Sequence, residues 1–123
     1  MSVWSAKSQN NNNQKWKIVT VNAPSFDANK TYEISSLSNS SFVLDAAANP
    51  PKIGANVSIW TSKNQANQKW IIEQLANGSY IIKSVGNSKL VLDATGATPK
   101  IGANVSVWTA NGGNNQKWNI KPA

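Results

Sequence analysis

The chain of 123 residues has no cysteine, no histidine and no arginine, and only five of its residues are acidic. Without cysteine it forms no disulfide and has no thiol nucleophile. Without histidine it lacks the commonest general base and the usual ligands of a zinc cluster. We therefore expect no metal site, no cofactor and no catalytic residues.

Long apolar runs are also missing from the sequence. No segment approaches the roughly 18 residues that cross a bilayer as a helix, and residues 1–7 lack the apolar centre of a signal peptide. Hydrophobic residues still make up 40% of the chain, which is enough for the core of one domain. All twelve basic residues are lysine, and the formal net charge is +7.

The chain does contain six tryptophans, and they fall into pairs. Gln-Lys-Trp occurs three times, ending at Trp16, Trp70 and Trp118. An asparagine precedes each copy and a second tryptophan lies upstream, which gives Trp4 with Asn13, Trp60 with Asn67, and Trp108 with Asn115. A motif that returns in this way indicates one structural unit used several times.

Two of the three copies are complete and are related by a shift of 48 residues, as Asp45 and Asp93 show. The segment Lys52–Ser58 recurs unchanged at Lys100–Ser106. The first copy has only its second half, because nothing in the chain matches residues 32–57. We therefore interpret residues 1–123 as a single domain with a partial repeat (1–30) and two full repeats (31–78 and 79–123).

Each full repeat predicts four short strands between turn residues, which in the first of them are 31–35, 42–45, 57–60 and 69–73. No stretch shows the 3.6-residue apolar period of a helix. The sequence therefore predicts an all-β fold.

The ordered set of Leu-Asp, Gly-x-x-Val-x-x-Trp and Asn-Gln-x-Trp resembles the ricin-type β-trefoil lectins and carbohydrate-binding modules. The resemblance covers the whole chain and implies a β-trefoil of three four-stranded repeats. In that fold the first and fourth strands of each repeat build a six-stranded barrel, and the second and third form hairpins that cap it. With the first half of repeat one missing, about ten of the twelve strands are expected here.

The resemblance also implies a lectin with one shallow site per full repeat for a galactose-type or related neutral sugar. The aspartate would accept hydrogen bonds from sugar hydroxyls, the upstream tryptophan would offer an exposed platform, and the asparagine would bond a hydroxyl. Serine stands where the family usually has a glutamine, two residues before the platform. The expected sugar-binding residues are Asp45, Ser58, Trp60, Asn67 and Gln68, and in the last repeat Asp93, Ser106, Trp108, Asn115 and Gln116.

From the residues alone, structural roles stay open for the same positions. An aspartate that ends a strand often caps a turn, a tryptophan often packs in a core, and an asparagine often serves a local turn. The glutamines are expected to satisfy buried loop groups. Trp16, Trp70 and Trp118 are expected in the core, and the first repeat, which has no matching aspartate, is expected to lack a sugar site.

Binding of an anionic polymer, either nucleic acid or an acidic cell-wall glycan, is the alternative function. The pI is about 9.9, and lysines recur in register at Lys52 and Lys100 and at Lys15, Lys69 and Lys117. The lack of arginine argues against nucleic acid, because bidentate contacts are then unavailable.

A protein-binding scaffold or inhibitor is a third class of function. A glycosidase is not expected, since it needs two carboxylates about 5 to 10 Å apart across one bond.

A barrel that lacks one strand has unpaired edges, which favour association. Three explanations stay open: a fragment of a longer protein such as a toxin or enzyme, a rearrangement of residues 22–30, or a homo-oligomer. We favour the homo-oligomer. The resemblance further implies a secreted or extracellular protein, although no signal peptide is present in this chain.

Overall fold

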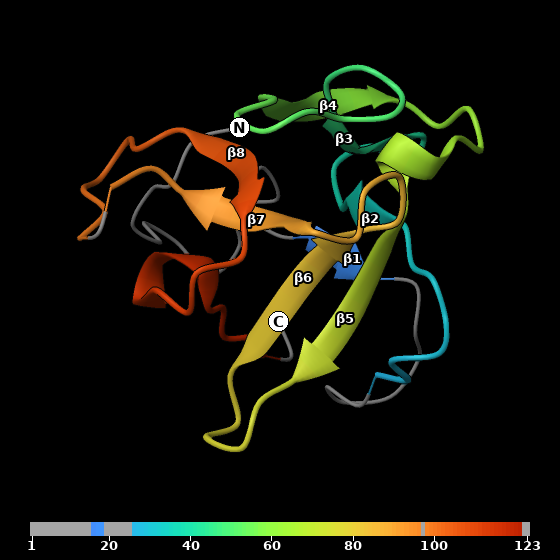
Figure 1. The fold of residues 1–123 in the computed structure, drawn as a ribbon. Helices are drawn as coiled ribbons and strands as arrows, with labels where there is room; N and C mark the ends of the chain where they lie inside the picture. The colour runs from blue at the N-terminus through green and yellow to red at the C-terminus, as the bar shows by residue number, and fades with distance from the viewer. Residues whose placement is uncertain (1–15, 19–25, 97, 122–123) are drawn as a thin grey trace.

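The structure is a computed structural model that describes residues 16–18, 26–96 and 98–121. Its elements confirm the all-β prediction (Figure 1). The strands are β1 (Trp16–Ile18), β2 (Ile34–Ser36), β3 (Phe42–Ala46), β4 (Val57–Thr61), β5 (Trp70–Gln74), β6 (Tyr80–Ser84), β7 (Leu90–Ala94) and β8 (Val105–Thr109). Two single-turn 3₁₀ helices, η2 (Ala66–Gln68) and η3 (Asn114–Gln116), were not expected from the sequence. No helix in the described ranges is long and apolar enough to span a membrane.

The strands form two antiparallel sheets, in the orders β1-β2-β3-β4 and β5-β6-β7-β8. Within the second sheet, β5 pairs with β6 over Trp70–Gln74 and β7 pairs with β8 over its full length. Only Lys83 and Val91 connect these two pairs of strands, so each sheet is a barrel pair joined to a capping hairpin. The second and third strands of each full repeat therefore form a hairpin, as the resemblance implied.

Isolated bridges join the first and the last strand of each full repeat and so continue the barrel. Tyr32 pairs with Trp70, and Tyr80 pairs with Trp118. The predicted last strand is reduced to this single bridge at Trp118 among the described residues. The strand expected around Trp4 lies outside the described residues, as do Asn13, Gln14 and Lys15.

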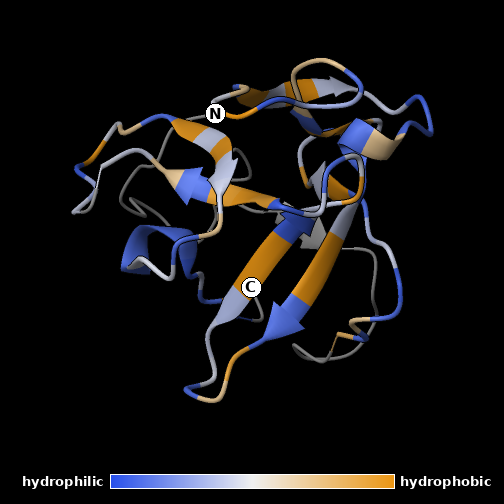
Figure 2. Ribbon diagram, viewed as in Figure 1, coloured by the Kyte–Doolittle hydropathy of each residue, from blue (hydrophilic) through white to orange (hydrophobic). Residues whose placement is uncertain are grey.

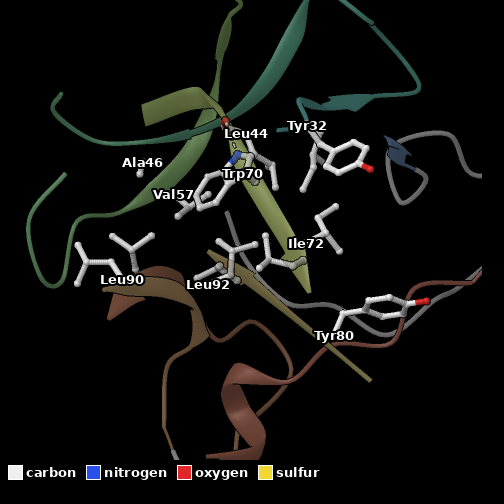
Figure 3. Packing of buried hydrophobic residues seen from close by; sticks show 13 residues of the cluster. Tyr32, Leu44, Ala46, Val57, Trp70, Ile72, Tyr80, Leu90 and Leu92 are labelled. Carbon is white, nitrogen blue, oxygen red and sulfur yellow. Dashed lines mark hydrogen bonds between the residues drawn. The ribbon is translucent and has the colours of Figure 1, made fainter. Parts of the chain in front are cut away.

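Apolar side chains of the strands meet in one core, while the loops and 3₁₀ helices are mainly hydrophilic (Figure 2). Trp70 lies at its centre with no exposed surface, and its indole N–H donates to the carbonyl of Leu44 at 3.3 Å (dashed line in Figure 3). Phe26 closes the core by edge-to-face contacts with Tyr32 and Tyr80. The core consists of Tyr32, Ile34, Leu44, Ala46, Val57, Trp70, Ile72, Tyr80, Ile82, Leu90, Leu92, Val105 and Val107.

The Trp118 side chain corrects one expectation. It was predicted to be as buried as Trp70, but it is only partly buried and packs against the edge of the core. Its indole N–H still donates to the carbonyl of Leu92 at 3.2 Å, so it occupies the same structural position as Trp70. Trp70 begins the five-residue strand β5, whereas Trp118 takes part only in an isolated bridge among the described residues. The Trp16 side chain is not among those described.

Candidate functional site

Asp45 is held by two amide side chains near the end of β3. Gln68 donates to Oδ2 at 2.9 Å, and Asn67 donates to Oδ1 at 3.3 Å. Both amides come from η2, which the chain forms immediately before the central Trp70. Asp45 as a residue is 8% exposed, and two donors leave part of the acceptor capacity of its carboxylate unused.

The same arrangement recurs around Asp93 in the last repeat. Gln116 donates to its Oδ2 at 2.9 Å and Asn115 donates to its Oδ1 at 3.2 Å, both from η3. Asp93 is 7% exposed. A network that returns with nearly the same distances is fixed by the repeat itself and not by a chance local contact.

Gln68 and Gln116 hold the aspartates and do not reach the surface. Each is 1% exposed. Gln68 gives its second N–H to the carbonyl of Thr61 at 3.0 Å, and its own oxygen accepts the N–H of Lys63 at 2.7 Å. The expected role in satisfying buried loop groups is therefore observed. In this conformation neither glutamine can donate to a sugar. Both N–H groups of each side chain are already bonded within the chain.

The two asparagines differ in exposure. Asn67 is 4% exposed and bonds the carbonyl of Ala46 at 2.9 Å in addition to Asp45, so its amide N–H groups face inward. Asn115 makes the matching bond to Ala94 at 3.1 Å but is only partly buried. Of the two, Asn115 is the one whose surface can meet a ligand.

The upstream tryptophans lie beside the aspartates, on the same face of each hairpin. Trp60 stands opposite Val43 and Ser58 opposite Asp45, so alternation along β3 and β4 places Trp60, Ser58 and Asp45 on one face. The last repeat repeats this register with Trp108, Ser106 and Asp93. Trp60 is 56% exposed and Trp108 is 46% exposed, as expected for these two positions.

In the last repeat these groups surround an open hollow of about 430 Å³. Four of the five residues predicted for this repeat line it, and Gln116, the fifth, lies behind Asp93. The full lining is Gly54, Asp93, Thr95, Gly96, Asn104, Ser106, Trp108, Asn111 and Asn115. A carboxylate, amides, a hydroxyl and an indole face together can bind a small polyhydroxylated molecule. Asp93 is the one carboxylate among the residues that line the hollow, whereas glycoside hydrolysis uses a pair.

Five lining residues were not anticipated from the sequence. Thr95 and Asn104 flank the loop of the β7–β8 hairpin, where Thr95 N–H donates to the carbonyl of Asn104 at 2.9 Å, so their place follows from hairpin pairing. Asn111 stands near the mouth because its N–H donates to the oxygen of Gln116 at 2.9 Å. Gly54 comes from the preceding repeat, and no sequence signal pointed to it.

The surroundings of the two repeats are not identical. Lys63 takes the position that Asn111 has in the last repeat, and its ammonium lies 5.8 Å from the centre of the Trp60 ring. Ala47 takes the position of Thr95. Gly54 approaches the Trp108 ring so closely that a Cβ on it would lie 3.4 Å from Cζ3. The two sites therefore share their carboxylate and indole but differ at the rim.

None of the lysines and glutamates considered in the sequence lines the hollow around Asp93. Lys52 and Lys100 are exposed on hairpin loops, and Lys69 and Lys117 are half-buried in the C-caps of η2 and η3. Glu73 pairs with Lys83 at 3.0 Å, and Glu33 accepts a hydrogen bond from Ser62. Among the described residues, no group of three or more acidic side chains could hold a metal ion.

Repeats of a barrel pair and a capping hairpin, each with a buried aspartate beside an exposed tryptophan, define a β-trefoil of the lectin-like class. The sequence matches the family described as ricin-type beta-trefoil lectin domain-like over residues 12–108 and 67–123. These matches span most of the chain, so the chain belongs to this family. A search of the curated proteins gives no significant match.

Solved structures agree with this assignment. The designed threefold symmetric protein ThreeFoil is 28% identical with a TM-score of 0.79, over 94% of this chain and 77% of that protein. The Macrolepiota procera ricin B-like lectin, solved with lactose, is 20% identical with a TM-score of 0.72, over 99% of this chain and 80% of the lectin. An exo-beta-1,3-galactanase from Clostridium thermocellum is 25% identical with a TM-score of 0.74, and the match covers 89% of this chain but 22% of the galactanase.

Proposed function

We propose that the chain is a carbohydrate-binding module for galactose-type or related neutral sugars, with one shallow site in each full repeat. The observation that carries the proposal is the Asp93 carboxylate, fixed by two amides at the base of a hollow whose rim is the exposed face of Trp108. The lactose complex of the similar lectin and the galactan substrate class of the similar galactanase support the choice of sugar.

The chemistry of such a site divides between its polar and its apolar side. The free acceptor positions of the carboxylate take hydrogen bonds from two neighbouring hydroxyls, and a charged acceptor makes these stronger than bonds between neutral groups. The indole covers the apolar C–H face of the ring. Asn115 and Ser106 supply further polar contacts, and Gln116 acts by holding Asp93.

Because both sites are open, each one alone binds weakly, with a dissociation constant of about 1 mM. Engagement of both sites on one glycan surface raises the overall affinity without any new contact. The module therefore acts on displayed glycans, outside the cell, and works as a binding unit and not as an enzyme.

Retention on an immobilised galactose-terminated glycan, with lactose as competitor, tests this function. The double variant Asp45→Asn with Asp93→Asn removes the charge of both sites and turns one acceptor oxygen of each into a donor, with little change in volume. It is expected to lose retention while circular dichroism shows that it is folded. Asp27→Asn is the matched control, because Asp27 is an exposed acid that bonds the N–H of Asn29 in a turn. Normal retention of the double variant would refute the site assignment.

The anionic-polymer alternative rests on the net charge of +7 and on the exposed Lys52 and Lys100. No lysine lines the hollow around Asp93. A glycan array run at low and at moderate salt separates the two functions. Lysine-driven binding falls steeply with salt, whereas stacking of a neutral sugar does not.

A further inference from the structure

The hairpin of β3 and β4 exposes apolar side chains that its counterpart buries. Phe42 is 41% exposed and Ile59 is 42% exposed, and both lie on the core-side face that they share with Leu44. The equivalent residues of the β7–β8 hairpin, Leu90 and Val107, are 1% and 0% exposed. The same face is therefore covered in one repeat and uncovered in the other.

In the last repeat the loop between β3 and β4 packs at this hairpin, where Ala55 contacts the core cluster that includes Leu90 and Val107. It adds itself to the outer edge of β8: Gly54 N–H donates to the carbonyl of Val107 at 2.8 Å, and Val107 N–H donates to the carbonyl of Ala55 at 3.0 Å. Pro51 of this loop is fully buried against Gly86, where a Cβ would lie only 2.7 Å from the proline ring. In Figure 1 this loop reaches from the upper hairpin toward β8.

The same six residues occur a second time in the chain, since Pro51–Asn56 and Pro99–Asn104 are identical. The second copy is not buried in the same way, because Pro99 is exposed where Pro51 is fully buried. On the outer edge of β4, no backbone group of another described residue bonds the backbone of Ile59. The N–H of Gly102 likewise has no backbone partner among the described residues. The chain thus carries an uncovered hairpin face and also a second copy of the loop that packs at the equivalent hairpin.

The two cannot meet within one molecule. Figure 1 shows the loop between β7 and β8 at one side of the fold and β4 at the top, well separated. Contact between them requires two chains.

We propose that the 99–104 loop of one molecule adds to the outer edge of β4 in a second molecule and covers Phe42 and Ile59. Gly102 N–H then donates to the carbonyl of Ile59, and Ile59 N–H donates to the carbonyl of Ala103, as Gly54 and Ala55 do with Val107 in the same chain. Two such contacts related by a twofold axis close a dimer. Ser38 stands where the last repeat has Gly86. Because a Cβ at this position would lie too close to the proline ring, Pro99 packs farther from the backbone of Ser38 than Pro51 does from Gly86.

The driving force is the burial of exposed apolar surface together with the pairing of backbone groups at a strand edge. The dimer is independent of the proposed sugar contacts, because Ile59 points to the face opposite Trp60 and Asp45. It presents four sugar sites on one particle, which increases avidity for a glycan surface.

Sedimentation at micromolar concentrations tests the proposal with matched pairs of variants. Pro99→Lys and Ile59→Lys are expected to weaken the dimer by about tenfold or more in dissociation constant. Ile101→Lys and Ile53→Lys are the controls, because both side chains are exposed and Ile53 stays 59% exposed although its loop is already docked. Circular dichroism confirms that each variant is folded. A parent protein that stays monomeric, or a dimer that all four variants leave intact, overturns the proposal.

Cross-linking identifies the contact, and the absence of cysteine makes single thiols easy to place. One tagged protein carries Ala103→Cys and a second carries Ile59→Cys, and a short bismaleimide is expected to join them into a mixed dimer. If the bismaleimide joined two Ala103→Cys chains to each other but did not join Ala103→Cys to Ile59→Cys, the proposed contact would be contradicted. A monomer whose Ile59→Cys thiol resists maleimide would assign the face to another segment of the same chain and equally refute the proposal.

Discussion

Gln116 donates one N–H of its buried amide to Oδ2 of Asp93 at 2.9 Å and thereby fixes the carboxylate at the base of the hollow. The other N–H binds the carbonyl of Thr109 at 3.0 Å, which ties the aspartate to the end of the hairpin. The Gln-x-Trp motif thus serves stability through its tryptophan and the site through its glutamine.

Removing this amide should therefore reduce both stability and binding. Gln116→Ala leaves one carboxylate oxygen of Asp93 and two backbone groups without their partner, and we expect the free energy of unfolding to fall by about 2 to 4 kcal/mol. Gln74→Ala, which removes an exposed amide with one long bond to Gly78, should change it by less than about 0.5 kcal/mol. Urea denaturation measures both. Equal losses would show that Gln116 is not held as described.

The two motif tryptophans should differ in their contribution to stability. Trp70→Ala opens a cavity at the centre of the core and should cost about 3 to 5 kcal/mol. Trp118 is only partly buried, so Trp118→Ala should cost clearly less. Thermal or urea unfolding of the two variants gives the comparison, and a greater loss at Trp118 would contradict the structure.

Lys63 should weaken the site of the first full repeat. Its ammonium lies over the Trp60 ring, and a cation–π contact at an exposed site contributes about 0.5 to 1 kcal/mol that a stacking sugar has to displace. Lys63→Asn, which copies Asn111, should therefore strengthen lactose binding by about twofold to fivefold. Titration followed by tryptophan fluorescence in an Asp93→Asn background isolates this site. Weaker binding would instead show that Lys63 contacts the sugar.

Gly54 should influence the site of the last repeat although it belongs to the preceding one. Gly54→Ala introduces a Cβ about 3.4 Å from the Trp108 ring and should weaken lactose binding at the Asp93 site, measured in an Asp45→Asn background. Gly102→Ala is the matched control, because φ is +84° at Gly54 and +85° at Gly102, so the backbone strain is the same. Equal effects on binding would mean that strain, not the Trp108 contact, is responsible.

Much of the fold could be predicted from the sequence, because the repeat carries its own structural signals. The motif tryptophans lie among apolar strand residues. The turn residues between the apolar segments mark where each strand ends. The exposure of Trp60 and Trp108 was implied by the family resemblance and is observed, whereas the residues alone left a core position open. The 3₁₀ helices could not be predicted, since a single turn has no apolar period to reveal it.

The sequence by itself determined the all-β repeat, because its strand and turn signals depend on residues close together in one repeat. Its resemblance to a known family then supplied the candidate aspartate and tryptophan of each site. Tertiary structure alone decided that Gln68 and Gln116 lie behind the aspartates, that Gly54 reaches the neighbouring site, and that Phe42 and Ile59 are uncovered. Each of these depends on which segments far apart in the chain become neighbours, and identical local sequences such as Pro51–Asn56 and Pro99–Asn104 then meet different surroundings.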